Sequence, residues 1–289
     1  KRQFMEKKEE GYMEEKGKKM VCVLPAAKEG QKASIWQSLL HHLGWREKPR
    51  IEEQEDQLLV HLPARELSPK EWERLWEDVK IQGAAIYCGD AVCMGKFDLP
   101  CAAGQALTAL CSGDLLEKAF PMGSRRKRLG VAVSENQTGL GETAVLSLAR
   151  KTDFLVIFSP EPQRWEPLCQ KILMEYGLLV TAVSSDSPLW KEMDGVVLSQ
   201  EVSCMPLPKG CTCLCLFSPA EYFLRRQAGS GRKTIYAGQK AKLQEARLFL
   251  AHEEFAAFLL EPSAQTGQSL FIRLEKYLAQ GWEKAWEIL

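Results

Sequence analysis

LGVAVSENQTGLGETAVLSLARKTDFLVIFS (residues 129–159) is the stretch that decides the fold. It holds a short apolar run, a loop with two glycines, a helix-length run and a second short apolar run. The two apolar runs, 129–134 and 154–159, are continuous rather than alternating, which is typical of strands buried on both faces. A strand, a helix of about ten residues and another strand predict a βαβ unit and a parallel sheet.

The same pattern continues toward the C-terminus. A helix is expected over 165–176, and Gly177 follows it as a common C-terminal cap. Further strands are expected at 178–184, 195–198 and 212–218, with a short helix or turn at 189–193. Because the strands are separated by helical runs, the sequence predicts an α/β fold whose sheet is mostly parallel.

A shorter alternation of expected strands and helices precedes residue 129. Ser68 is followed by Pro69 and Glu71, a combination that predicts a capped helix N-terminus. The expected elements are strands at 21–24, 58–62 and 84–88 and helices at 34–43, 68–82 and 107–120. The N-terminal part is therefore also interpreted as α/β.

The C-terminal part predicts two long helices, 240–261 and 268–289, around a break at Pro262 and Gly267. Apolar side chains recur in the second helix at spacings of three and four, which builds one apolar stripe. They are Leu270, Leu274, Tyr277, Leu278, Trp282 and Trp286. Two interpretations remain open: packing on the sheet, or a homodimer contact through this C-terminal helix.

Four segments follow from these patterns. We expect a solvated tail over 1–19, an N-terminal α/β domain over 20–122, a linker over 123–128 and a second α/β domain with C-terminal helices over 129–289. The linker carries Gly, Ser and a basic cluster that ends at Arg128. Such a run is usually a solvated connector.

The segment GLGETA (residues 139–144) matches the pattern G-x-G-x-x-A between an expected strand and an expected helix. Glycines there would let the backbone approach a pyrophosphate, whose charge the helix N-terminus favours. Glu161 follows the next strand, where an acidic side chain can hold a ribose hydroxyl. A plain glycine-rich loop between strand and helix is the other interpretation.

Over about 35 residues this stretch resembles the Rossmann-type NAD(P)-binding superfamily. The resemblance implies a Rossmann-like, mostly parallel sheet flanked by helices, with a smaller N-terminal α/β part and C-terminal helices. It implies NAD(P) as a cofactor, although the residues themselves leave the ligand unknown. The residues expected at the cofactor are Ser134, Asn136, Thr138, Gly139, Gly141, Thr143 and Glu161.

Two functions stay open. The first is binding of a nucleotide or another phosphorylated small molecule at the C-terminal edge of the strands, as in an oxidoreductase. The alternative is a non-enzymatic regulatory or protein-binding protein that uses the same scaffold. No HExxH or GxSxG motif occurs. Asp90 and Asp186 follow expected strands, where each serves either as a general base or as a loop cap.

Charge and cysteine usage narrow the class further. Lys and Arg number 38, as do Asp and Glu, so a strongly basic nucleic-acid-binding protein is not indicated. No apolar run approaches the ~18 residues of a membrane helix. The ten cysteines lack zinc-site spacing, and no metal site is expected. Many lie in apolar runs, so we expect buried, reduced thiols and a cytoplasmic protein.

Overall fold

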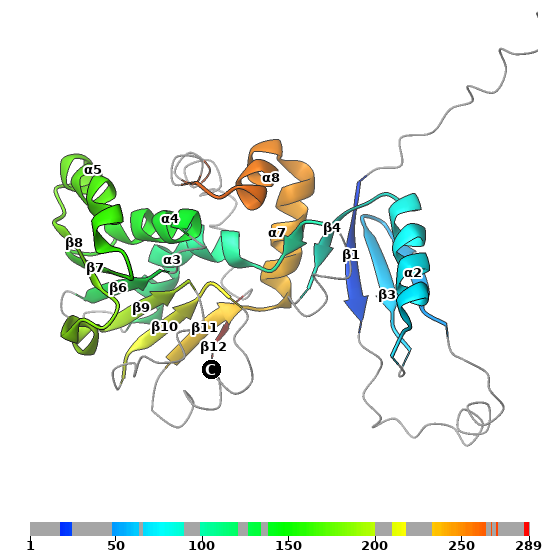
Figure 1. Cartoon of the computed structure of the whole chain (residues 1–289), viewed down its shortest axis with the longest axis horizontal. Helices are drawn as coiled ribbons and strands as arrows, with labels where there is room; N and C mark the ends of the chain where they lie inside the picture. Colours follow the sequence, from blue (N-terminus) through cyan, green and yellow to red (C-terminus); the bar gives the residue numbers. More distant parts are fainter. Residues whose placement is uncertain are drawn as a thin grey trace, which may run out of the picture. The chain divides into compact units, whose positions relative to one another are not determined.

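The computed structural model describes residues 18–24, 48–63, 66–89, 99–120, 127–133, 138–199, 210–217, 233–263, 267, 270 and 286–288. The chain divides into two compact units, Lys1–Tyr87 and Cys88–Leu289. Figure 1 shows the elements of both units, coloured along the sequence.

The first unit pairs a small sheet with a helix. Its elements are β1 (Lys19–Leu24), β2 (Arg50–Gln54), β3 (Gln57–His61), α2 (Pro69–Ile81) and β4 (Ala84–Cys88), and its strands follow the order β2-β3-β1-β4. β1 lies parallel to β3, whereas β2 lies antiparallel to it. The Glu71 carboxylate accepts a hydrogen bond from the Ser68 backbone N–H at 2.9 Å, so α2 begins with the predicted capping box. The helix expected at 34–43 lies outside the described residues.

The second unit alternates strands and helices along most of its length. Its elements are β5 (Cys101–Ala102), α3 (Gln105–Ala119), β6 (Arg128–Ala132), α4 (Thr138–Ala149), β7 (Phe154–Ser159), the 3₁₀ turn η3 (Pro162–Trp165), α5 (Glu166–Tyr176), β8 (Val180–Ser184), the 3₁₀ turn η4 (Pro188–Glu192), β9 (Gly195–Leu198), β10 (Thr212–Cys215), β11 (Lys233–Ala237), α7 (Gln239–Ala251), α8 (Glu253–Leu260) and β12 (Trp286–Ile288). Of the helices described, none is long and apolar enough to cross a membrane.

The strand order of the second unit defines its fold. The sheet runs β12-β11-β10-β9-β6-β7-β8, and all its pairings are parallel except the one between β11 and β12. Numbered from β6, the parallel strands follow the order 3-2-1-4-5-6, which is that of the doubly wound Rossmann fold. The predicted α/β class and the mostly parallel sheet flanked by helices are therefore confirmed.

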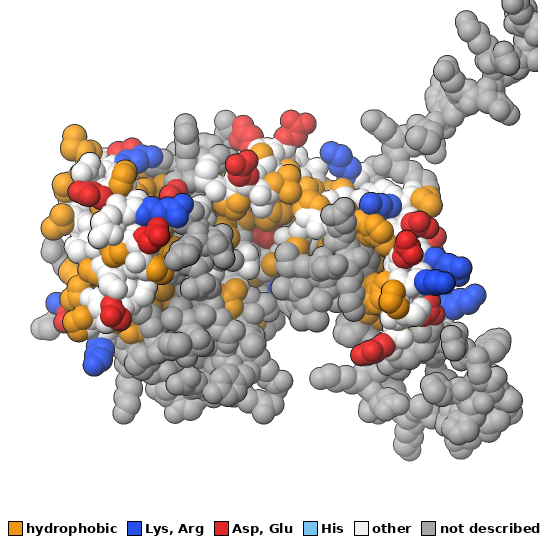
Figure 2. Space-filling model, viewed as in Figure 1, with side chains coloured by type: hydrophobic (Ala, Val, Ile, Leu, Met, Phe, Trp, Pro, Cys, Tyr) orange, Lys and Arg blue, Asp and Glu red, His pale blue; other side chains and the backbone are white. Residues whose placement is uncertain are grey.

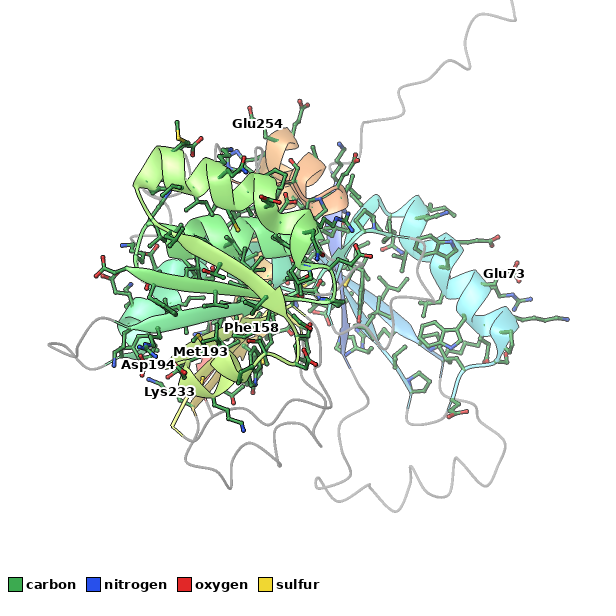
Figure 3. All side chains as sticks on the ribbon, turned by 60° about the vertical axis from the view of Figure 1, so that its left-hand side comes forward. Glu73, Phe158, Met193, Asp194, Lys233 and Glu254 are labelled. Carbon is green, nitrogen blue, oxygen red and sulfur yellow. The ribbon has the colours of Figure 1, made fainter. Side chains whose placement is uncertain are left out.

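Two cores lie on opposite faces of this sheet. On the helix-covered face, Leu155 and Ile157 of β7 share a cluster with residues of α3, α4, α5, α7 and α8. On the other face, Phe158 packs edge-to-face on Trp190 of η4, with ring centroids 4.6 Å apart. Figure 3 shows Phe158 and Met193 on the side of the sheet away from α4 and α5.

The C-terminal prediction needs a correction. A helix was expected over 268–289, but Trp286–Ile288 form β12, which pairs antiparallel with β11. The outer edge of β11 would otherwise present unpaired backbone N–H and C=O groups, and an added strand satisfies them. Residues 271–285, which carry most of the apolar stripe, lie outside the described residues. The homodimer contact through this segment stays a prediction.

The division into units falls earlier than the linker expected at 123–128. In the structure it lies between Tyr87 and Cys88. The reason is the packing of α3, whose residues Leu107 and Leu110 belong to the same buried cluster as α4. α3 is therefore part of the Rossmann-like unit, although it precedes the first parallel strand of that unit.

Candidate functional site

The candidate site lies at the carboxyl edge of the second-unit sheet. β6 and β9 are neighbours, but the chain leaves β6 toward β7 and leaves β9 toward β10 on the other side. This reversal is the topological switch point, where ligands of open α/β sheets bind as a rule. α4 follows β6 directly and begins at this edge.

The glycine motif opens the helix itself rather than forming the loop before it. α4 begins at Thr138, so Gly139 and Gly141 are helical residues of its first turn. Ser134 and Asn136 lie outside the described residues, as does the side chain of Thr138. Of the predicted site, the structure therefore shows Gly139, Gly141 and Thr143 together on α4 and Glu161 after β7.

Gly139 lies where Pro262, from the segment after α8, packs against the start of α4. A β-carbon at this position would overlap the carbonyl oxygen of Pro262 and would lie 3.2 Å from its Cβ. Pro262 follows α8 and packs against the first turn of α4. A protein neighbour therefore explains glycine at this position without a ligand.

Gly141 serves close packing between helix and strand. A β-carbon there would overlap Cγ1 of Val133, which follows β6, and would lie 3.3 Å from Cη2 of Trp165. In the dinucleotide fingerprint, close helix–strand packing is the role of the third glycine, whereas the second lets the backbone approach the pyrophosphate. The space beside Gly141 is thus filled by protein.

Thr143 uses its hydroxyl within the helix. Its Oγ1 donates a hydrogen bond to the Gly139 carbonyl at 2.8 Å, and the residue is buried. A β-carbon on Gly267 would lie 2.8 Å from the same oxygen. Thr143 therefore lies beside Gly267 in the C-terminal part of the chain. Its hydroxyl stabilises the first turn of α4 through the bond to Gly139.

The turn after β7 is built around Ser159. Its Oγ accepts hydrogen bonds from the Trp165 indole N–H at 3.0 Å and from the Glu161 backbone N–H at 3.1 Å. This turn holds Glu161 at the start of η3, where its side chain is exposed. The carboxylate is accessible at the carboxyl edge, although Ser159 itself is committed to the turn.

Of the two candidate acid–base residues, only Asp186 belongs to the described part of the chain. Asp90 lies outside the described residues. Asp186 follows β8, and its Oδ1 accepts a hydrogen bond from Ser184 Oγ at 2.6 Å. β8 is the last strand at its end of the sheet, away from the switch point. Within the described ranges, no three His, Cys, Asp or Glu side chains gather in a group that could hold a metal ion.

A buried carboxylate that sequence reasoning missed lies on α7. Glu245 is fully buried, and its two oxygens accept hydrogen bonds from the backbone N–H groups of Gly104 and Leu107, both at 2.8 Å. These donors form the N-terminal turn of α3, whose partial positive charge favours an anion. Burial raises the pKa of Glu245 to about 7, although the backbone N–H groups act in the opposite direction.

Glu245 fastens α7 to the start of α3. Gly104 has a φ of +82°, and a β-carbon there would overlap the Cβ of Ala237, so β11, α7 and the turn before α3 meet closely. In the sequence, Glu245 is marked only by its apolar neighbours on the same helix, Ala241, Ala246 and Leu248. The structure shows that these neighbours are buried. Its role in this geometry is structural.

The residues present fit a phosphate-bearing ligand in part. The N-terminus of α4 lies at the carboxyl edge and carries the partial positive charge that favours an anion. Glu161 offers an exposed carboxylate after the neighbouring strand. Because protein fills the space beside Gly139 and Gly141, the backbone N–H groups at the start of α4 and the Glu161 carboxylate are the described groups that remain for a ligand.

No family model matches the chain, and no curated protein matches it. Among solved structures, quinate dehydrogenase from Corynebacterium glutamicum in complex with NAD is 14% identical, with a TM-score of 0.37 over 89% of this chain and 100% of that chain. L-tryptophan dehydrogenase from Nostoc punctiforme is 10% identical, with a TM-score of 0.40 over 91% and 84%.

A third match is partial. The Δ(1)-pyrroline-2-carboxylate reductase of Thermococcus litoralis, in complex with NADH and L-proline, is 11% identical, with a TM-score of 0.30. It is matched over 39% of this chain, which spans 36% of the length of that protein. The strand order of the chain itself defines its fold.

Proposed function

We propose that the second unit binds a nucleotide, or another phosphorylated small molecule, at the carboxyl edge of its sheet beside the start of α4. The observation that carries this proposal is the switch point between β6 and β9, with the N-terminus of α4 at the same edge. Ligands of open α/β sheets bind at this place, and a helix N-terminus there favours phosphate.

The proposed contacts come from the start of α4 and from the turn after β7. Ser134, Asn136 and Thr138, whose side chains lie outside the described part of the chain, are proposed as further contacts because they directly precede Gly139 and Gly141 in the sequence. Glu161 would accept a hydrogen bond from a sugar hydroxyl. Thr143 is left out of this contact set because its buried hydroxyl already bonds to the Gly139 carbonyl.

NAD(P) is the ligand that the resemblance of the β6–α4–β7 segment implies, and an oxidoreductase is the corresponding enzyme class. When bound, such a cofactor supplies or accepts the hydride. The residues of this chain would hold its phosphates at α4 and a ribose hydroxyl at Glu161. We also propose a reducing, cytoplasmic setting, supported by the finding that none of the eight described cysteines forms a disulfide with another described one.

A thermal-shift series on the full chain tests the binding. NAD, NADP, ATP and S-adenosylmethionine are added separately, and the melting temperature is followed. A ligand that binds the folded state alone, present at a hundred times its Kd, stabilises it by about 2.7 kcal/mol. A rise with one of these compounds supports the proposal, and the absence of a rise with all four contradicts binding of a nucleotide.

A pair of variants on β7 then locates the site. Glu161 follows the carboxyl end of the strand, and Asp153 precedes its amino end, and both side chains are exposed. Glu161→Ala should weaken binding by about 1.5–3 kcal/mol, the value of a hydrogen bond to a charged group. Asp153→Ala should leave the affinity unchanged. Equal losses in both variants would place the ligand elsewhere.

A further inference from the structure

The end of the second-unit sheet at β8 carries an apolar surface. Met174 of α5 is 86% exposed, and Leu179, which precedes β8, is 72% exposed. In Figure 2, orange side chains gather at the left end of the view, over α5 and β8. Exposed large apolar side chains that cluster in this way mark interaction sites.

Among the strands that the structure describes, β8 lies at the edge of the second-unit sheet. It is the last strand at its end of the sheet, whereas β12 covers the opposite end at β11. Its sequence, VTAVS, holds no charged residue and no proline. Natural edge strands usually carry one of these to prevent pairing with another chain. The edge strand β2 of the first unit, RIEEQ, carries three charges.

The outer side of α5 carries one positive and one negative side chain, so it is complementary in charge to a second copy of the same helix. Lys171 and Glu175 are one turn apart on this helix and form an ion pair at 3.9 Å. Arg150, directly after α4, stacks on the ring of Tyr176, so the Tyr176 side of α5 faces α4. Lys171 is rotated by more than 90° about the helix axis from Tyr176. It therefore lies on the side of α5 away from α4, toward the outer edge of β8.

We propose that this surface, made by β8 and the outer side of α5, binds a second copy of the chain through a two-fold axis near the middle of β8. Antiparallel pairing of β8 with its copy uses the same backbone groups on both chains, as an isologous interface requires. The two sheets become continuous, and Met174 and Leu179 are withdrawn from water.

The charges fit this symmetry. A two-fold axis makes α5 and its copy antiparallel; where it passes level with residue 173, midway between the two charges, Lys171 of one chain lies alongside Glu175 of the other, and the reverse pair forms at the same time. The intrahelical pair thus becomes a four-charge group across the interface. An unrelated partner would need a matching strand edge and matching charges, whereas a second copy supplies both.

Sedimentation velocity of the full chain over a concentration series tests the proposal. The wild type is expected to form a dimer. Met174→Asp and Leu179→Asp each place a charge in the contact and should raise the dimer dissociation constant about tenfold or more. Ile81→Asp is the matched control, because Ile81 on α2 of the first unit is 71% exposed and should leave the dimer intact.

Charge reversal tests the proposed ion pairs across the interface more sharply. Lys171→Glu alone should weaken the dimer, and Lys171→Glu combined with Glu175→Lys should restore it, because the symmetric pairs form again. Hydrogen exchange at the outward-facing amides of β8 should be slow in the wild type and fast in Met174→Asp. A wild type that stays monomeric at its highest soluble concentration overturns the proposal. A dimer that survives both Met174→Asp and Leu179→Asp also overturns it, and would point to the segment 268–289 instead.

Discussion

The carbonyl group of Pro262 occupies the place that a β-carbon of Gly139 would take. This contact joins the segment after α8 to the first turn of α4, beside the switch point of the sheet. A glycine that looks like part of a phosphate cradle in the sequence is therefore a packing residue in the fold. The consequence for the site is that its outline is set partly by the C-terminal part of the chain.

Adding a methyl group at either glycine of α4 should destabilise the protein. Exposed helix positions gain about 1 kcal/mol from Gly→Ala, but overpacking costs about 1–3 kcal/mol. We expect Gly139→Ala to cost more than Gly141→Ala, because its neighbour is the backbone of Pro262 rather than the side chain of Val133. Urea unfolding measures both, and a stabilised Gly139→Ala would contradict the packing described.

The stability of the second unit should fall as pH rises because of Glu245. Its pKa in the fold, about 7, lies above the ordinary 4.5, so the folded chain keeps a proton that the unfolded chain releases. The stability from this group is complete below pH 4.5 and is lost as pH rises through 7. The loss amounts to about 3 kcal/mol.

Glu245→Gln separates this effect from the other titrating groups. The amide cannot ionise, so the free energy of unfolding of the wild type minus that of the variant should decrease between pH 4.5 and pH 7. Glu253→Gln, at an exposed position of α8, is the control and should follow the wild-type curve. A difference between wild type and Glu245→Gln that stays constant with pH would show that Glu245 does not titrate in this range.

Thiol labelling should be slow in the folded protein. Cys22, Cys88, Cys111, Cys211, Cys213 and Cys215 are buried, whereas Cys101 and Cys169 are partly exposed. Burial also raises the pKa of Cys111 and Cys169, which lowers the reactive thiolate fraction. Of these eight, Cys101 and Cys169 should react first with a thiol reagent, and denaturation should release nearly all ten. Rapid modification of Cys211 or Cys213 in the native protein would contradict the buried core.

Removing β12 should weaken the edge of the sheet. Deletion of 286–289 leaves the outer groups of β11 without their antiparallel partner. At roughly 0.2–1 kcal/mol for each cross-strand pair, the three pairs predict a loss of about 0.6–3 kcal/mol. Unfolding of the truncated chain in urea gives the value, and equal stability would show that β12 contributes nothing to the sheet.

Much of the fold could be read from local pattern. β7 and β9 have the predicted bounds, because continuous apolar runs flanked by polar residues leave little choice of strand ends. β2 and β11 were missed. β2, RIEEQ, is a charged edge strand that is held by its partner β3, and β11, KTIYA, begins with polar residues and lacks a continuous apolar run. The long helix expected over 240–261 is interrupted at His252, where α7 ends and α8 begins.

The site could be predicted less well, for a physical reason. The glycine spacing locates the start of α4, but it does not reveal that Pro262 and Val133 fill the adjacent space. Glu245 was missed because the groups that hold it, the N–H groups of Gly104 and Leu107, belong to another helix. Contacts between distant segments decide both cases, and no local pattern encodes them.

Amide shifts of glycines labelled with ¹⁵N test ligand binding at α4 most directly. The protein is titrated with the compound that gives the largest thermal shift among NAD, NADP, ATP and S-adenosylmethionine. The account predicts saturable shifts at Gly139 and Gly141 of α4, with Gly177 after α5 and Gly210 before β10 unmoved at the opposite edge. Saturable binding that leaves Gly139 and Gly141 unmoved would contradict it.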